Sequence, residues 1–138
     1  MARKRRARKD IGTLFLANKV ASTLLVLFIP SHDRNHRPIN QDYLVSSALE
    51  CLGELFGGAT AYPRGKGVWR DDVQGGELLF DEPVVIQCYT TEALIERHAA
   101  ELRAFLIEMG SKCGQGAVGF VIDQDYLEIA FPLQKEAT

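Results

Sequence analysis

The chain has 138 residues, of which 46% are hydrophobic and 25% are charged. These values suit one soluble globular domain that can bury a core without disulfides or a structural metal, and they exclude a fibrous or wholly disordered protein. The formal net charge of −2 conceals an asymmetry, because 6 of the 16 basic residues lie within the first nine positions. We predict a disordered basic arm at residues 1–10 and a single domain at residues 11–138.

The basic arm has enough positive charge to neutralise several phosphates, so we expect it to contact nucleic acid or an acidic partner. The alternative is a solvated tail. Without the arm, residues 10–138 keep 10 basic and 18 acidic side chains, a net charge of −8, which makes the body a poor platform for nucleic acid. The basic residues of the arm are Arg3, Lys4, Arg5, Arg6, Arg8 and Lys9.

The first half of the domain is predicted to form a strand, a loop and a helix. Residues 21–29 are apolar on both alternations, which predicts a central strand with both faces covered. A polar loop follows at residues 31–38. Asn40 is the expected N-cap of the first helix, and Gly57 with Gly58 is expected to end it.

The second half of the domain is predicted to form further strands and one further helix. Residues 59–70 predict a kinked edge strand and residues 77–89 the next strand. The second helix is expected from Thr90 or Thr91 to Gly110. Two last strands, 117–122 and 126–131, are expected to pair as a hairpin.

This order predicts an α+β fold, a ferredoxin-like strand-helix-strand-strand-helix-strand sandwich with an extra C-terminal strand. Two helices can cover one sheet face only. Because residues 21–29, 84–89 and 117–122 are apolar on both alternations, we expect the other face to be covered by a second copy or a partner protein.

The loop after the first strand is rich in histidine and charged side chains, and it lies at a position where sheet proteins often bind ligands. The spacing of four between its histidines would suit a metal only on a helix, and Pro38 favours a loop, so we expect an anion-binding or solvated loop and no metal site. Its candidate ligand-binding residues are His32, Asp33, Arg34, His36 and Arg37.

A second candidate region mixes aromatic and basic side chains with glycines that allow close backbone approach. The alternative interpretation is a kinked edge strand whose Trp69 packs on the domain or on a partner. The candidates here are Tyr62, Arg64, Lys66, Trp69 and Arg70.

Motifs of known catalytic sites and cofactor sites are absent from the sequence, so we expect no cofactor and assign no catalytic residue. The three cysteines, Cys51, Cys88 and Cys113, form no close pair, which favours a reducing cytoplasm over a disulfide framework. The apolar run at residues 20–29 is about half the roughly 20 residues that a membrane span needs, so no membrane contact is expected.

Three short segments, Gly57–Pro63, Gly67–Trp69 and Gly114–Val118, resemble a group of small uncharacterised bacterial proteins with this order of helices and strands. The resemblance covers roughly residues 20–131 and implies a ferredoxin-like fold. It implies no activity.

Two functional hypotheses follow. The leading one is a non-enzymatic binding or assembly subunit, homo-oligomeric or part of a larger complex, with the arm on nucleic acid or an acidic partner. The alternative is a small-molecule enzyme or ligand sensor of the dimeric α/β type that uses the His32–Arg37 loop. A ligand site needs a concave pocket with convergent polar groups, whereas an assembly subunit needs a large contact surface.

Overall fold

The computed structural model describes residues 11–133, arranged as helices on one face of a sheet. The strands are β1 (Thr23–Ile29), β2 (Thr60–Tyr62), β3 (Gly67–Asp71), β4 (Glu77–Asp81), β5 (Val84–Thr90), β6 (Ala117–Ile122) and β7 (Asp125–Ala130). The helices are α2 (Gln41–Phe56), α3 (Glu92–Arg97) and α4 (Ala99–Lys112), with a short 3-10 helix at Asp72–Gln74. The mixed α+β class with an antiparallel sheet is confirmed.

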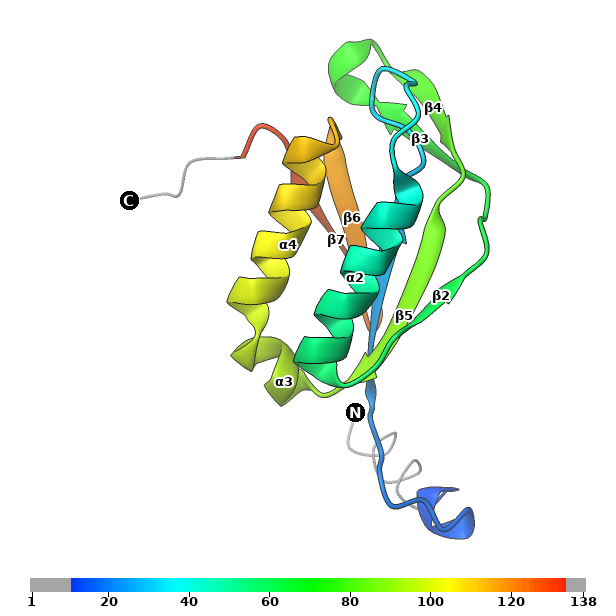
Figure 1. The fold of residues 1–138 in the computed structure, drawn as a ribbon, viewed down its shortest axis with the longest axis vertical. Coiled ribbons are helices and arrows are strands. Elements are labelled where there is room, and N and C mark those ends of the chain that lie inside the picture. The colour runs from blue at the N-terminus through cyan, green and yellow to red at the C-terminus, as the bar shows by residue number, and fades with distance from the viewer. Residues whose placement is uncertain (1–10, 134–138) are drawn as a thin grey trace.

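The main sheet has five strands in the order β2-β5-β1-β6-β7, and all neighbours are antiparallel. β3 and β4 form a separate two-stranded hairpin. Figure 1 shows α2 and α4 side by side over one face of the sheet, with the hairpin beyond one end of them.

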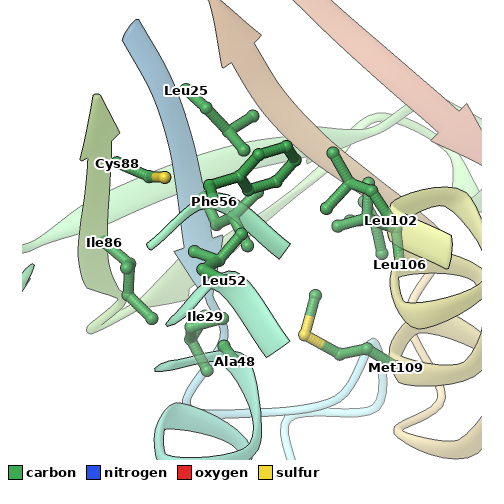
Figure 2. Close-up of a cluster of buried hydrophobic side chains, with 12 residues drawn as sticks. Leu25, Ile29, Ala48, Leu52, Phe56, Ile86, Cys88, Leu102, Leu106 and Met109 are labelled. Atoms are coloured by element: carbon green, nitrogen blue, oxygen red, sulfur yellow. The ribbon is translucent and has the colours of Figure 1, made fainter. Parts of the chain in front are cut away.

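The core lies between the sheet and the helices. Alternate residues of β1 point to the helices, and Leu25, Leu27 and Ile29 are fully buried. Figure 2 shows side chains of β1 and β5 facing those of α2 and α4. The buried helix residues are Ala48, Leu52, Phe56, Leu102, Leu106 and Met109.

The predicted helix signals are confirmed at three ends. The side chain of Asn40 accepts from the Tyr43 backbone N–H at 3.2 Å, and Thr91 caps α3 by accepting from Leu94 at 3.2 Å. Gly57 ends α2 with a left-handed φ of 95°. The expected single second helix was wrong in one respect, because it is divided at His98 into α3 and α4.

Gly110 does not end α4, as the sequence suggested, but lies inside it. A Cβ there would clash with the ring of Phe131 and lie 2.8 Å from Val118 Cγ2, so glycine is needed for close packing of β6 and of the residue after β7 against the helix. Gly110→Ala should therefore cost about 1–3 kcal/mol of unfolding free energy, measured by urea denaturation. Gly53→Ala in α2, where a Cβ meets nothing within 4 Å, should instead gain about 0.5–1 kcal/mol. Equal effects of the two changes would contradict this packing.

The two predicted strands at residues 59–70 and 77–89 were also too long. Each is divided, because the chain leaves the main sheet after β2 and returns at β5. Pro63 and Pro83 flank the departure and return and lack the N–H that a continuous ladder needs. The Gly65 N–H donates to the Pro83 carbonyl at 2.9 Å, and this hydrogen bond joins the segment that leaves the main sheet to the segment that returns to it.

The excursion places the β3–β4 hairpin against the sheet face opposite the helices. Trp69 of β3 contacts Phe28 of β1, which points away from the core. Part of the face that we expected a second copy or partner to cover is thus occupied by the chain's own hairpin. Farther along this face Tyr89 is 61% exposed, and cover by another chain there stays a prediction.

Candidate functional site

A pocket of about 240 Å³ lies where the hairpin, the loop after β1 and the open sheet face meet. Its apolar wall is aromatic. The Trp69 ring stacks on Tyr126 with a centroid separation of 6.5 Å and an interplanar angle of 25°, and it meets Phe28 edge-on at 6.5 Å and 72°. The three rings come from β3, β7 and β1, so the pocket exists only in the folded chain.

A glycine in β6 lets the Tyr126 ring lie across the sheet. A Cβ at Gly119 would clash with the Tyr126 hydroxyl and ring, and the register places Gly119 opposite Glu128. The Tyr126 hydroxyl donates to Glu128 Oε2 at 3.0 Å. Burial, and next the hydrogen bond to Glu128, raise the pKa of Tyr126 to about 12, so the phenol stays protonated near neutral pH.

The loop after β1 is fixed by its own aspartate. Asp33 Oδ1 accepts from the backbone N–H groups of Asn35 at 2.8 Å and Arg37 at 3.0 Å. The Arg37 hydrogen bond is the main cause that lowers the pKa of Asp33. His36 takes a left-handed φ of 62° in this turn, and its Nε2 lies 3.0 Å from Glu77 Oε1 of β4. The predicted loop is therefore a compact turn attached to the hairpin.

Arg34 connects the loop to the hairpin. Its Nη2 lies 3.2 Å from Asp71 Oδ2, and the Asp71 side chain is only 8% exposed. The guanidinium also lies against Gly116, where a Cβ would be 3.3 Å from Cζ. Arg34 Nε is buried and has no hydrogen-bond partner among residues 11–133. Arg34 and Asp71 therefore line the pocket as an ion pair, and one donor of Arg34 is left without a partner within the described residues.

A chain of hydrogen bonds runs from Asp81 through Ser31 to His32, which lines the pocket. Asp81 Oδ1 accepts from the Ser31 backbone N–H at 2.8 Å and from the Ser31 hydroxyl. The same hydroxyl lies 2.7 Å from His32 Nδ1. This arrangement orients an imidazole that can exchange a proton with a ligand, provided that the tautomer leaves Nε2 as the acceptor.

The carboxylates of the pocket outnumber its guanidinium groups by five to two. Asp71 pairs with Arg34 and Asp72 with Arg70, while Asp33 and Asp81 accept from uncharged donors. Glu128 has no cationic partner within residues 11–133. No set of three or more His, Cys, Asp or Glu residues in that range is placed to hold a metal ion. The pocket thus offers a carboxylate beside aromatic rings.

Six of the ten predicted ligand-binding residues line this pocket: His32, Asp33, Arg34, His36, Trp69 and Arg70. Arg37, Tyr62, Arg64 and Lys66 do not. Tyr62 belongs to β2, the edge strand farthest from β7, where its hydroxyl donates to Gln87 at 3.2 Å. The predicted nucleic-acid-binding residues, Arg3, Lys4, Arg5, Arg6, Arg8 and Lys9, lie outside the described residues.

Sequence reasoning missed five lining residues that matter for the chemistry: Phe28, Asp71, Asp81, Tyr126 and Glu128. Tyr126 and Glu128 alternate along β7, which places them on one face of the sheet. That alternation was the available signal. Phe28 and Asp81 lie in the predicted strands 21–29 and 77–89, Asp71 lies between two predicted strands, and nothing local marks the three as neighbours.

Comparison with known proteins identifies structural neighbours only. A phage SAM lyase in complex with S-methyl-5′-thioadenosine has a TM-score of 0.64 and 16% identity, over 86% of this chain and 98% of that chain. The phage SAM lyase in its apo state gives a TM-score of 0.57 and 16% identity, over 83% and 94%. No protein-family model and no curated protein matches the sequence. At this identity the likeness shows a shared fold.

Helices within residues 11–133 are all too short or too polar to cross a membrane.

Proposed function

We propose that the pocket binds a small organic cation with an aromatic or apolar body, and that the protein is a small-molecule enzyme or ligand sensor. One observation carries the proposal: Glu128, which no cation neutralises in the described chain, lies beside the stacked pair of Trp69 and Tyr126. A cation near ring faces gains about 0.5–2 kcal/mol from the ring quadrupoles, and a carboxylate adds charge attraction.

The volume suits a small ligand or one part of a larger one. About 240 Å³ lies just below the range of about 300–1,000 Å³ that small-molecule sites occupy. S-Adenosylmethionine (SAM) combines a sulfonium cation with an aromatic base, and the neighbours that share this fold are described as SAM lyases. SAM is therefore the first ligand to test, with S-methyl-5′-thioadenosine as its uncharged counterpart.

An enzymatic role would draw on His32. Its ring is oriented through Ser31 by Asp81, and it lines the same pocket as Glu128. An imidazole held in this way is suited to accept a proton from a bound ligand. Incubation with SAM, followed by chromatographic analysis for thioether products, distinguishes an enzyme from a sensor.

Glu128→Gln should separate charge recognition from ring recognition. The amide keeps the shape of the side chain and can still accept from Tyr126, but it lacks the negative charge. We expect SAM binding to weaken about tenfold, which corresponds to roughly 1.4 kcal/mol, and binding of the uncharged thioether to change little. Calorimetric titration of both ligands measures this.

The matched control is Lys66→Gln, which also removes a charge but lies outside the pocket. It should leave both affinities unchanged. An equal loss of affinity for SAM and for the uncharged thioether in Glu128→Gln would contradict recognition of the cation.

The remaining sequence hypotheses stay proposals. The order β2-β5-β1-β6 with antiparallel neighbours supports the ferredoxin-like description, and β7 is the predicted extra strand. We also propose a cytoplasmic location on the basis of the unpaired cysteines. An arm that contacts nucleic acid or an acidic partner rests on its charge alone.

A further inference from the structure

A short apolar helical segment at the start of the described chain projects from the sheet and the helices. Residues 11–17, here called the N-terminal knob, close on themselves: the Phe15 N–H donates to the Ile11 carbonyl at 3.2 Å and the Ala17 N–H to the Gly12 carbonyl at 2.8 Å. Figure 1 shows this segment beyond the end of the sheet, away from the helices. Leu14, Phe15 and Leu16 are 79%, 79% and 86% exposed. Such a concentration of exposed apolar side chains is typical of a contact surface.

A groove of about 440 Å³ lies between α2 and the second half of α4, and its lining runs along α2 from Asn40 to Glu54. Its walls include apolar side chains of both helices, and its rim is mainly acidic. Lys112, the one basic residue of the lining, is paired with Glu108 at 2.7 Å. The residues used below are Tyr43, Leu44, Glu50, Cys51, Glu54 and Cys113. We call this the helix groove.

We propose that the N-terminal knob of one copy docks into the helix groove of a second copy. The apolar side chains of the knob match the apolar walls. Charge supports the same pairing, because the basic arm directly precedes the knob in sequence, while Glu50 and Glu54 line the groove. This inference concerns assembly and does not depend on the proposed ligand.

Geometry favours a second copy over the chain's own groove. Figure 1 shows the knob projecting beyond the end of the sheet and away from both helices, whereas the groove lies between the helices, along α2 and the second half of α4. A contact between two different surfaces of identical molecules runs head to tail. Such contacts close into a ring or continue as a filament, according to the rotation between copies.

Native mass spectrometry of the full chain tests the contact. Wild type should be larger than the 15.3 kDa monomer, and both Phe15→Glu in the knob and Tyr43→Glu in the groove should reduce it to the monomer. Both positions are exposed, Phe15 at 79% and Tyr43 at 67%, so neither change disturbs the core. Leu78→Glu, at an exposed position outside both surfaces, should keep the wild-type mass.

Mixing the two monomeric variants is the sharper test. Phe15→Glu keeps an intact groove and Tyr43→Glu keeps an intact knob, so an equal mixture should form a dimer with one intact contact. A symmetric contact made of knobs alone or grooves alone cannot be restored in this way. A monomeric wild type, an unchanged mass in either variant, or a mixture that stays monomeric would overturn the proposal.

Thiol alkylation places the contact in the groove. Cys51 and Cys113 line it, whereas Cys88 is 1% exposed in the core and serves as an internal control. Docking should slow alkylation of Cys51 and Cys113 in wild type, and Phe15→Glu should restore it several-fold without exposing Cys88. Equal alkylation of Cys51 and Cys113 in wild type and Phe15→Glu would place the knob elsewhere and refute the groove assignment.

Discussion

Replacing Trp69 by alanine should weaken SAM binding by a factor of about 5–30 while the main sheet stays folded. The Trp69 ring contacts both Phe28 and Tyr126, so its loss removes the centre of the aromatic wall. A cation–π contribution of about 1–2 kcal/mol at a partly desolvated site corresponds to a factor of roughly 5–30 in affinity. Isothermal titration calorimetry measures the change directly.

Tyr62→Ala is the matched control for this prediction. Tyr62 is an aromatic residue that the sequence also placed at the ligand site, but the structure puts it on the opposite edge strand. Its removal should leave SAM affinity within error of wild type. An equal loss in both variants would indicate a general effect on the fold rather than a contact in the pocket.

Leu27→Ala should lower the free energy of unfolding by about 2–5 kcal/mol. Leu27 is fully buried in the central strand and belongs to the core between sheet and helices, so its truncation leaves a cavity that rigid neighbours cannot fill. Because a domain is stable by only about 5–15 kcal/mol, this is a large part of the total. Urea denaturation followed by circular dichroism gives the value.

Leu78→Ala removes the same atoms from a leucine that is 51% exposed on the hairpin. We expect a cost within about 0.5 kcal/mol. A small effect at Leu27 together with a large one at Leu78 would contradict the assignment of the core to the helix side of the sheet.

The layered fold could be predicted from local signals, because each depends on residues close in sequence. Asn40 and Gly57 mark the ends of α2 through capping geometry, and the apolar run before Pro30 marks β1. The division of both segments was missed because residues 59–70 were interpreted as one kinked edge strand and residues 77–89 as one strand, across Pro63 and Pro83. They mark the points where the chain leaves the sheet and rejoins it.

Part of the candidate site could be predicted from the sequence. The His32–Arg37 loop follows a strand, and that position together with its histidine and charged side chains suggested a ligand site. The partners of Arg34 in the loop and of Ser31 just before it lie far along the chain: Asp71 is 37 residues from Arg34, and Asp81 is 50 residues from Ser31. Such pairings depend on where the hairpin folds back, which no local pattern specifies. Tyr126 and Glu128 were assigned to a terminal strand for the same reason.

The most direct test of the proposed ligand site uses the tryptophan fluorescence of the full chain. Trp69 is the only tryptophan, so its emission reports on this pocket alone. Titration with SAM should change the emission saturably in wild type, and the curve should shift about tenfold to higher concentration in Glu128→Gln. An unchanged emission at every SAM concentration, or superimposable curves for wild type and Glu128→Gln, would contradict a cation-binding pocket.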